Sequence, residues 1–458
     1  MVKRIHVPSI VQSISRVFSE AGYEVYLVGG AVRDRLLRRK EGKQDYDLAT
    51  NAHPKDVQSL FRRVIPTGID HGTVTVFYRG VSFEVTTFRS DGTYLDHRRP
   101  DDVQFSNSIH EDLKRRDFTM NALALHGVTG QLVDDHGGRD DIKGRVIRAI
   151  GDPIHRFEED ALRMLRACRF ASQLGFTLEE ATLEGITRCA GLIAFVSPER
   201  IKDELDGLLS SAIPSTGLEL MRTTGLMEQI LPELLAGVDV EQKGNHRFDV
   251  YRHCLLSCDG APREHLLLRW AALLHDIGKP ESMGSDELGI TTFHRHEQIS
   301  SAQAEKLMRR FCFSNRDREY ILHLIRNHMY HYTPEWSDAA VRRFIAQVGY
   351  DALEDLFILR RADQYGTFGS HTKHDSNREL RQRIDTIRGQ QDALTIKDLA
   401  VNGKDLMEEL HLKPGRVIGV LLEQLLESVL DDPAMNNRAQ LLEVAKRYYE
   451  MHLTGEQR

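Results

Sequence analysis

Two aspartates, Asp45 and Asp47, follow a glycine pair within one short stretch near the start of the chain. Residues 26–37 form an apolar run, a Gly29-Gly30 turn and a segment with helical spacing. The turn lets backbone N–H groups approach an anion closely, and a helix that opens there favours phosphate. Asp45 and Asp47 lie two apart in an expected strand, where their carboxylates share one face and repel unless a cation lies between them. The combination predicts a phosphate cradle beside paired Mg²⁺ ions, and therefore nucleotidyl transfer.

Glu84 is a candidate third carboxylate beside these metal ions. Residues 73–88 alternate as a hairpin around Arg79-Gly80, with Glu84 on its second strand. The alternative is an exposed strand glutamate without a ligand, which is equally common in proteins.

Asp160 and Arg163 are candidates for recognising a base. They lie three apart in residues 156–174, which have strong helical spacing, so an intrahelical salt bridge is one interpretation. The other rests on complementarity. Cytosine and adenine both present an exocyclic amino donor beside a ring-nitrogen acceptor, whereas uracil and guanine present a carbonyl beside a ring N–H. One acceptor and one donor, Asp160 and Arg163, would then select C and A without a nucleic-acid template.

A second group of metal-ligating residues lies beyond residue 240, where histidines become frequent. His275-Asp276 ends an apolar helix expected at residues 266–274, and more His and Asp residues lie on separate expected helices. Imidazoles combined with carboxylates suit Ni, Mn, Co or Zn at an open site with room for water and phosphate. The candidate ligands are His253, His275, Asp276 and Asp363, with His296 and His328 as second-site ligands or phosphate contacts.

Residues 87–105 are polar and have neither helical nor strand spacing. A surface connection is one interpretation. The other is a loop that carries Arg89, Arg98 and Arg99 towards nucleotide or RNA.

The composition is that of a globular protein. The chain has 458 residues, 41% apolar and 28% charged, and this length predicts several units with their own cores. No apolar run reaches the ~18 residues that span a bilayer, and the first residues lack the apolar segment of a signal peptide. We therefore expect a cytoplasmic protein with no membrane partner. Five cysteines without Cys-x-x-Cys spacing predict reduced core thiols.

The charge pattern indicates local contact with RNA. The net charge is −7, which argues against indiscriminate nucleic-acid binding. Basic clusters at residues 38–40, 62–63, 98–99 and 114–116 nevertheless lie in the first third of the chain.

The first motif resembles a known family. Gly29-Gly30-Ala31-Val32-Arg33-Asp34 followed by Asp45-Tyr46-Asp47-Leu48 is similar to the head of the class II tRNA nucleotidyltransferase and bacterial poly(A) polymerase family. Later stretches resemble the family's other motifs in the same order: Arg115-Arg116-Asp117, Glu159-Asp160-Ala161-Leu162-Arg163 and residues 197–205. The last of these would give structural support. The resemblance extends from about residue 25 to residue 448.

The resemblance implies roles for particular residues. Asp45 and Asp47 would hold Mg²⁺, Arg116 would donate to phosphate, and Asp117 would accept from a sugar hydroxyl. The loop at residues 87–105 would serve the final adenosine step. The implied nucleotide-binding residues are Gly29, Gly30, Arg33, Asp34, Arg115, Arg116, Asp117, Asn121, Asp160 and Arg163.

The implied activity is the addition of C, C and A to the 3′ end of tRNA from CTP and ATP, without a nucleic-acid template. The partners would be tRNA, CTP and ATP, with no DNA. Within the family, an A-adding or CC-adding enzyme or a poly(A) polymerase stays open. A different class would be an HD phosphohydrolase whose head merely binds tRNA, but such a module would have no need for the paired-metal site of Asp45 and Asp47.

The histidine-rich stretch is similar to an HD-type metal phosphohydrolase, with His253, His275, Asp276 and Asp363 matching its first metal site. The expected fold is mixed α+β, a small-sheet nucleotidyltransferase head followed by a predominantly helical neck, body, HD domain and tail. The expected boundaries are 1–150 for the head, 151–240 for the neck and body with the base-recognition helix, 241–375 for the HD domain and 376–458 for the tRNA-binding tail.

Overall fold

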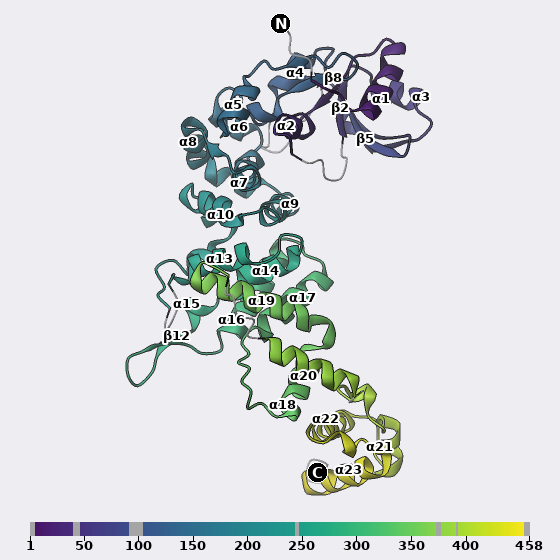
Figure 1. The fold of residues 1–458 in the computed structure, drawn as a ribbon, viewed down its shortest axis with the longest axis vertical. Helices are drawn as coiled ribbons and strands as arrows, with labels where there is room; N and C mark the ends of the chain where they lie inside the picture. The colour runs from purple at the N-terminus through teal and green to yellow at the C-terminus, as the bar shows by residue number, and fades with distance from the viewer. Residues whose placement is uncertain are drawn as a thin grey trace. The chain divides into compact units, whose positions relative to one another are not determined.

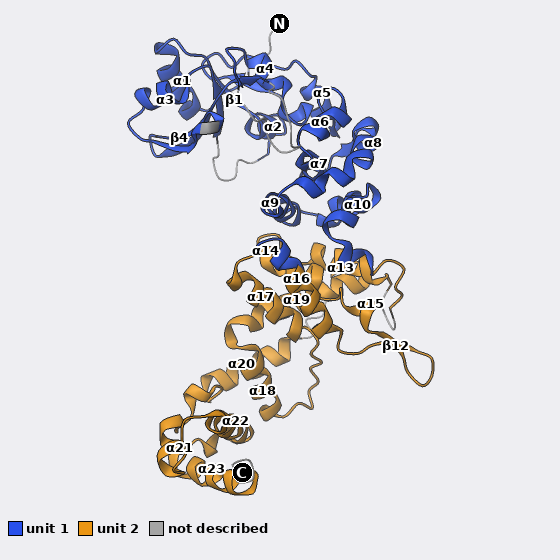
Figure 2. Ribbon diagram, turned by 180° about the vertical axis from the view of Figure 1, so that it is seen from behind, with its two compact units in different colours: residues 1–236, 307–312 blue, residues 237–306, 313–458 orange. Residues whose placement is uncertain are grey.

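The computed structural model describes residues 5–39, 46–90, 104–242, 247–371, 377–390 and 393–452 (Figure 1). They form two compact units, residues 1–236 with 307–312 and residues 237–306 with 313–458 (Figure 2). Helices dominate both units and the principal sheet lies in the first, so the expected mixed α+β class is confirmed.

A seven-stranded sheet in the first unit carries acidic residues on neighbouring strands. Its order is β3-β4-β5-β2-β1-β8-β9, and β2 pairs with β5 in parallel while the other neighbours are antiparallel. The strands are β1 (Val25–Val28), β2 (Tyr46–Thr50), β3 (Val64–Gly68), β4 (Thr73–Tyr78), β5 (Val81–Thr87), β8 (Ala124–His126) and β9 (Leu132–Val133). The predicted hairpin is confirmed: β4 and β5 join through Arg79 and Gly80, both at positive φ, as a two-residue hairpin turn requires.

The helices of the first unit are α1 (Ser9–Glu20), α2 (Gly30–Leu36), α3 (Pro54–Leu60), α4 (Ile109–Lys114), α5 (Gly138–Gly144), α6 (Pro153–Glu159), α7 (Leu162–Leu174), α8 (Glu180–Cys189), α9 (Pro198–Leu209), α10 (Pro214–Thr223), α11 (Leu226–Ile230) and α12 (Pro232–Leu235). Short strand pairs accompany them, β6 (Arg89–Ser90) with β7 (Gln104–Phe105) and β10 (Val146–Ile147) with β11 (Thr177–Leu178). The helical spacing of apolar residues over residues 8–21 predicts a helix, and α1 confirms it by burying Val11, Ile14 and Phe18 on one face.

Two local predictions were wrong, and a third lies largely outside the described residues. The single helix predicted over residues 156–174 is two helices, α6 and α7, because Asp160 is extended between them (φ −147°, ψ 101°). The sequence also predicts that residues 115–117 begin a helix, but these residues follow the end of α4. The loop predicted at residues 87–105 begins and ends in the paired strands β6 and β7, and its residues 91–103, including Arg98 and Arg99, lie outside the described residues.

Within the residues that the structure describes, the second unit is helical apart from one hairpin. Its elements are α13 (Val250–Gly260), α14 (Leu266–Leu274), α15 (Lys279–Ser282), β12 (Met283–Ser285), β13 (Thr291–Phe293), α16 (His296–Arg310), α17 (Asn315–Asn327), α18 (Asp338–Val348), α19 (Tyr350–Phe368), α20 (Arg378–Gly389), α21 (Gly403–Glu409), α22 (Arg416–Asp431) and α23 (Arg438–His452). Helices α13 and α19 approach closely because Gly366 lacks a Cβ, which would lie 2.7 Å from the His253 carbonyl oxygen. This contact brings Asp363 of α19 towards His253 of α13.

All five cysteines are free thiols. Four are buried as predicted, whereas Cys312 is exposed. A hydrogen bond from the Cys312 thiol to Glu199 raises the pKa of that thiol. None of the helices in the described part of the chain is both long and apolar enough to cross a membrane.

Candidate active site and candidate metal centre

A cleft of about 530 Å³ in the first unit gathers the residues predicted to bind nucleotide. Those that line it are Gly29, Gly30, Arg33, Asp47, Glu84, Arg115, Arg116, Asp117, Asn121, Asp160 and Arg163. Two of the predicted residues are not among them. Asp45 lies outside the described residues, and Asp34 supports the cleft from beside it by accepting a hydrogen bond from Arg33 Nε at 2.9 Å.

Asp47 and Glu84 lie side by side in the cleft. They are register partners on the parallel strands β2 and β5, and both occupy exposed positions of strands whose neighbouring residues are buried. Gly29 faces them at φ 67°, and a Cβ there would lie 3.2 Å from Arg116 Nη1 and 4.0 Å from Asp47 Oδ2. The missing side chain leaves space between an arginine and a carboxylate, which suits a metal-bound phosphate.

Asp112 is a buried carboxylate that sequence reasoning missed. Its Oδ1 accepts from Arg115 and its Oδ2 from Arg116, with Nη2 distances of 3.2 and 3.0 Å. Burial alone would raise the pKa of Asp112, but the charges of Arg116 and Arg115 outweigh it and lower that pKa. Asp112 therefore anchors both guanidinium groups at the edge of the cleft. The sequence offered one indication of this role, because Asp112 lies three residues before Arg115 and four residues before Arg116.

Asp117 belongs to a chain of buried polar contacts. Its Oδ1 accepts from Asn121 Nδ2 at 3.1 Å and its Oδ2 from Arg166 Nη2 at 2.8 Å, while Asn121 Oδ1 accepts from Arg33 Nη1 at 2.7 Å. Burial would raise the pKa of Asp117, but Arg166 and these hydrogen bonds lower it to about 2. The predicted sugar-binding carboxylate is thus held ionised and in one orientation.

The two predicted base-reading residues have separate partners. Arg163 donates to Glu159 Oε2 at 2.7 Å and to the carbonyl oxygens of Arg156 and Arg115, both at 3.1 Å. Asp160 pairs instead with Arg200 of α9, at 2.8 Å between Oδ2 and Nη2. The intrahelical salt bridge considered for Asp160 and Arg163 was therefore the wrong pairing.

Arginines dominate the lining of the cleft. Among the described residues, eight arginines line it, against four carboxylates, Asp47, Glu84, Asp117 and Asp160. The eight are Arg33, Arg89, Arg115, Arg116, Arg163, Arg166, Arg169 and Arg200. Sequence reasoning missed Arg166, Arg169 and Arg200. Their positions on helices did not indicate a role in the cleft, because arginines on helices commonly face solvent. This excess of fixed positive charge suits a polyanion such as a nucleoside triphosphate.

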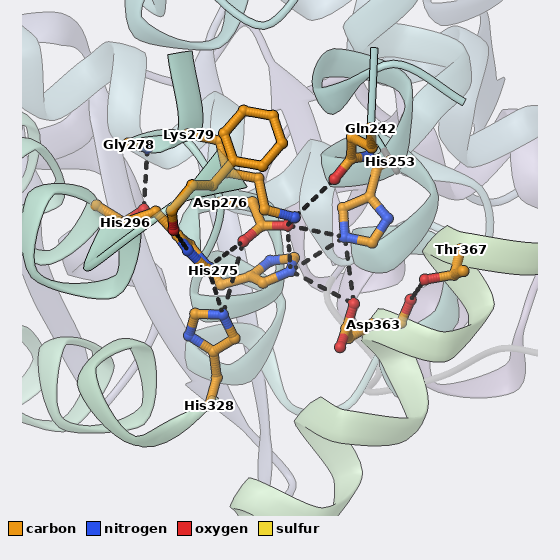
Figure 3. Close-up of polar contacts among 12 residues, drawn as sticks. Gln242, His253, His275, Asp276, Gly278, Lys279, His296, His328, Asp363 and Thr367 are labelled. Carbon is orange, nitrogen blue, oxygen red and sulfur yellow. Dashed lines mark hydrogen bonds and ion pairs between the residues drawn. The ribbon is translucent and has the colours of Figure 1, made fainter. Parts of the chain in front are cut away.

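The candidate metal centre lies in the second unit, where the predicted ligands converge (Figure 3). On one side, Asp276 Oδ2 is 3.1 Å from His253 Nε2 and 3.3 Å from His275 Nε2. Asp363 Oδ1 completes this group at 3.2 Å from His253 Nε2. All four of these side chains are at least 85% buried, and they come from α13, the end of α14 and α19.

The other oxygen of Asp276 faces the remaining two histidines. Asp276 Oδ1 is 3.2 Å from His296 Nε2 and 3.6 Å from His328 Nε2. Asp276 therefore lies between the Nε2 atoms of His253 and His275 and those of His296 and His328, and His275 is close enough to share a metal ion with Asp276 and His328 as well as with His253 and Asp363. Lys279 also contacts this carboxylate, 2.6 Å from Oδ2 (Figure 3).

Backbone carbonyls orient three of the imidazoles. The Nδ1 atoms of His275, His296 and His328 lie 2.7–2.8 Å from the carbonyl oxygens of Ala272, Phe293 and Ile325. Each Nδ1 is thereby assigned as the donor to its carbonyl, and each Nε2 points into the cluster, where it can hold either a proton or a metal ion. This outer support is characteristic of metal-ligating histidine.

The charges of the cluster favour a cation. Burial lowers the pKa of His275, but Asp276 and Asp363 together raise it to about 10. Burial would raise the pKa of both carboxyls. The charges of His275 and Lys279 nevertheless hold the pKa of Asp276 well below its usual range. Hydrogen bonds from His253 and His275 hold the pKa of Asp363 well below its usual range. Two buried carboxylates that attract a proton this strongly would attract a divalent metal in its place.

Three stretches of the sequence match known families. Residues 25–148 match the poly A polymerase head domain, residues 175–237 the "Probable RNA and SrmB- binding site of polymerase A", and residues 281–445 domain 2 of tRNA nucleotidyltransferase. Enzymes with this nucleotidyltransferase fold use Mg²⁺.

Similar proteins span almost the whole chain. The CCA-adding enzyme of Levilactobacillus brevis is 36% identical over 451 residues, 95% of this chain and 98% of that enzyme. The CCA-adding enzyme of Bacillus velezensis is 34% identical over 427 residues, 93% of this chain and 94% of that enzyme. The crystal structure of the Bacillus stearothermophilus CCA-adding enzyme in complex with CTP matches with a TM-score of 0.73 at 29% identity, covering 96% of this chain and 97% of that one. The chain belongs to the family of CCA-adding enzymes, which are tRNA nucleotidyltransferases.

Proposed function

We propose that this protein adds C, C and A to the 3′ end of tRNA from CTP and ATP, without a nucleic-acid template and with two Mg²⁺ ions. One observation carries the proposal. A single cleft holds the carboxylate pair Asp47 and Glu84, an excess of arginines, and the acceptor and donor Asp160 and Arg163. Metal binding, triphosphate binding and base selection are thus available in one place.

Asp47 and Glu84, with Asp45, would hold the Mg²⁺ ions. The fit rests on two carboxylates side by side on parallel strands and on the space at Gly29 between Asp47 and Arg116. Bound Mg²⁺ supplies a Lewis acid that acidifies the attacking 3′-hydroxyl and neutralises charge on the triphosphate.

The protein's own groups bind and orient the nucleotide. Arg115 and Arg116, fixed by Asp112, are placed to donate to phosphate oxygens, and Asp117 is placed to accept from the ribose. Asp160 would accept from the exocyclic amino group that C and A share, and Arg163 would donate to their ring nitrogen. The protein itself thereby replaces a template base.

One assay separates this function from its relatives within the family. Three tRNA transcripts, ending before the first C, before the second C and before A, are each supplied with CTP, ATP or both. Completion of all three supports CCA addition. A product that stops after CC or extends only the third transcript identifies a CC-adding or an A-adding enzyme, and long A tails identify a poly(A) polymerase.

The Nε2 atoms of four histidines lie around Asp276, those of His253, His275, His296 and His328. This cluster favours a second activity in the second unit, metal-dependent hydrolysis of phosphate esters. His253, His275, Asp276 and Asp363 would hold a Ni, Mn, Co or Zn ion, with His296 and His328 at a second position. A metal there would acidify water into a nucleophile. Nucleotide addition by the first unit acts on RNA 3′ ends. We therefore expect the substrate of the second unit to be a terminal RNA phosphate, such as a 2′,3′-cyclic phosphate that blocks nucleotide addition. Hydrolysis of 2′,3′-cyclic nucleotides and phosphomonoesters with each metal in turn tests this activity.

The proposed functions divide the chain among four parts: the head to residue 150, the neck and body to 240, the HD domain to 375 and a tRNA-binding tail to 458. A cytoplasmic location accompanies them, because tRNA and nucleoside triphosphates are available there.

A further inference from the structure

The six candidate ligands of the metal centre differ in their access to solvent. The side chain of Asp363 is 15% exposed, whereas those of the other five ligands are at most 5% exposed. A molecule in solution therefore meets the cluster first at Asp363. The Oδ1 atom of Asp363 faces the imidazole of His253, 3.2 Å from Nε2 (Figure 3). Its Oδ2 atom instead accepts a hydrogen bond from Arg360 Nη1 at 3.0 Å.

Arg360 lies at this exposed margin of the metal centre. It precedes Asp363 by three residues on α19, and its side chain is 28% exposed. Its guanidinium lies over the ring of Tyr330, with Cζ 5.9 Å from the ring centre. Tyr330 follows His328 by two residues, and its hydroxyl donates to Asn377 Oδ1 at 3.0 Å. Arg360 is therefore fixed beside two ligands, and its bond to Asp363 uses one N–H group of a guanidinium that has several.

A bound metal would leave the cluster with an excess of positive charge. Each carboxylate already pairs with one cation, Asp276 with Lys279 and Asp363 with Arg360. The imidazoles are neutral when they bind a metal, so these charges cancel and a divalent ion adds positive charge that an anion can balance. Lys279 is only 10% exposed and also donates to Gln242 Oε1 at 2.6 Å. An anion that enters the site would therefore meet Arg360 before Lys279.

We propose that Arg360 binds the phosphate group of the substrate at the metal centre. The inference rests on the proposed hydrolysis of phosphate esters. Arginine suits this role because its planar guanidinium can donate to two phosphate oxygens at once. The contact with Asp363 keeps the guanidinium beside a candidate ligand without placing it among the converging Nε2 atoms. Arg360 thereby favours esters whose phosphate is charged.

The test uses three variants of the full chain. Arg360→Gln removes the charge but can still donate to Asp363, Arg360→Met removes the charge and the donor, and Arg360→Lys keeps the charge. The control is Arg381→Gln, because Arg381 also pairs with a carboxylate, that of Glu354 at 2.9 Å, and lies over the ring of Phe357 with a side chain that is 25% exposed. Calorimetric titrations with Ni, Mn, Co and Zn in turn measure metal binding, and titrations at saturating metal measure the binding of inorganic phosphate.

We expect Arg360→Gln and Arg360→Met to weaken phosphate binding by roughly tenfold or more, the value of a hydrogen bond to a charged group, with little change in metal binding. Arg360→Lys should keep most of the phosphate affinity, and Arg381→Gln should match the wild type. Unchanged phosphate affinity in both neutral variants would overturn the proposal. An equal loss of metal affinity would also overturn it, since Arg360 would then only position Asp363.

The wild-type protein separates this inference from the proposed hydrolysis. If it binds no phosphate with any of the four metals, the role of Arg360 is wrong. If phosphate binds and depends on Arg360 but no ester is hydrolysed, the proposed hydrolysis is refuted while the phosphate-binding role stands.

Discussion

Asp47 on β2 and Glu84 on β5 are register partners in the parallel strand pair of the head sheet. Neighbouring strands lie about 4.8 Å apart, so two side chains on the same face at the same register bring their carboxylates close together. The cost of like charges at this distance falls when a cation binds between them. Because Glu84 lies beside Asp47, a metal-binding role is better supported for Glu84 than for a glutamate that lies alone on an exposed strand.

We expect Asp47→Asn to lower kcat for nucleotide addition by about three orders of magnitude, because it removes a metal-binding charge. Binding of tRNA should change little, since the substitution is isosteric. Glu84→Gln should lower kcat as well, by roughly tenfold or more. Single-turnover incorporation and a tRNA filter-binding assay measure the two quantities. Near wild-type incorporation by both variants would refute the metal role, and Glu184→Gln, on the surface of α8, is the control.

We expect Asp160→Ala and Arg163→Ala each to reduce discrimination against UTP and GTP by roughly 1–3 kcal/mol, the value of one base contact. Glu159→Gln should produce a smaller loss of the same kind, because Glu159 accepts from Arg163 Nη1 at 2.7 Å. Competition assays with paired nucleotides measure the ratios. If the variants retained C and A selectivity and only unfolded at lower temperature, the three side chains would be structural.

The loop between β6 and β7 gives a prediction about product length. Because residues 87–105 carry Arg89, Arg98 and Arg99, we expect the wild-type protein to complete the A step. Removal of residues 91–96 should leave products that end in CC, with C addition nearly unchanged. Sequencing of product 3′ ends checks this. Full-length CCA products from the deletion would mean that the loop is only a connection.

Asp117 gives a prediction about pH and stability. Its folded-state pKa of about 2 lies below its usual value of 3.8, so its ion pair stabilises the fold fully above about pH 4 and loses its effect as the pH falls towards 2. We expect Asp117→Asn to lower the free energy of unfolding by about 2 kcal/mol at neutral pH, and by less as the pH falls below 4. Urea titrations of both proteins measure the difference. A difference that stays constant down to pH 3 would contradict the ionic contribution, and exposed Asp203→Asn is the control.

Much of the fold could be predicted from local patterns. The hairpin at Arg79-Gly80 and helix α1 depend on alternation and spacing within a few residues, and both are confirmed. The break at Asp160 could not be predicted in this way, because helical spacing continues on both sides of it. Its stabilising partner, Arg200, comes from a helix 40 residues later, and only tertiary packing brings the two together.

The same distinction applies to the candidate sites. Motifs identified many of the residues that line the cleft, because their residue types follow from the chemistry of phosphate, metal and base, though not Arg166, Arg169 and Arg200. The partners that hold them, Asp112 and Glu204, are acidic residues on helices. Their local sequence offers only the spacing of Asp112 before Arg115 and Arg116 and the motif at residues 197–205 that contains Glu204, and neither indication says which side chain each carboxylate contacts. In the second unit the ligands were predictable individually, whereas the division of Asp276 between two groups of histidines required the structure.

The second unit gives the prediction that separates the two activities. The double variant His275→Ala, Asp276→Ala removes two ligands at the centre of the cluster. We expect it to abolish metal binding and metal-dependent hydrolysis of 2′,3′-cyclic nucleotides, while addition to tRNA with a free 3′-hydroxyl stays nearly intact. The reason is that no residue of the cluster lines the cleft of the first unit.

Metal content after loading with Ni, Mn, Co or Zn, hydrolysis and nucleotide addition are measured on one preparation. His331→Ala, an exposed histidine of the same unit, is the control. If the wild-type protein binds metal but hydrolyses no substrate, the cluster is a metal-stabilised scaffold for RNA. If the double variant loses nucleotide addition while remaining folded, the two activities are coupled and the prediction of separable sites is wrong.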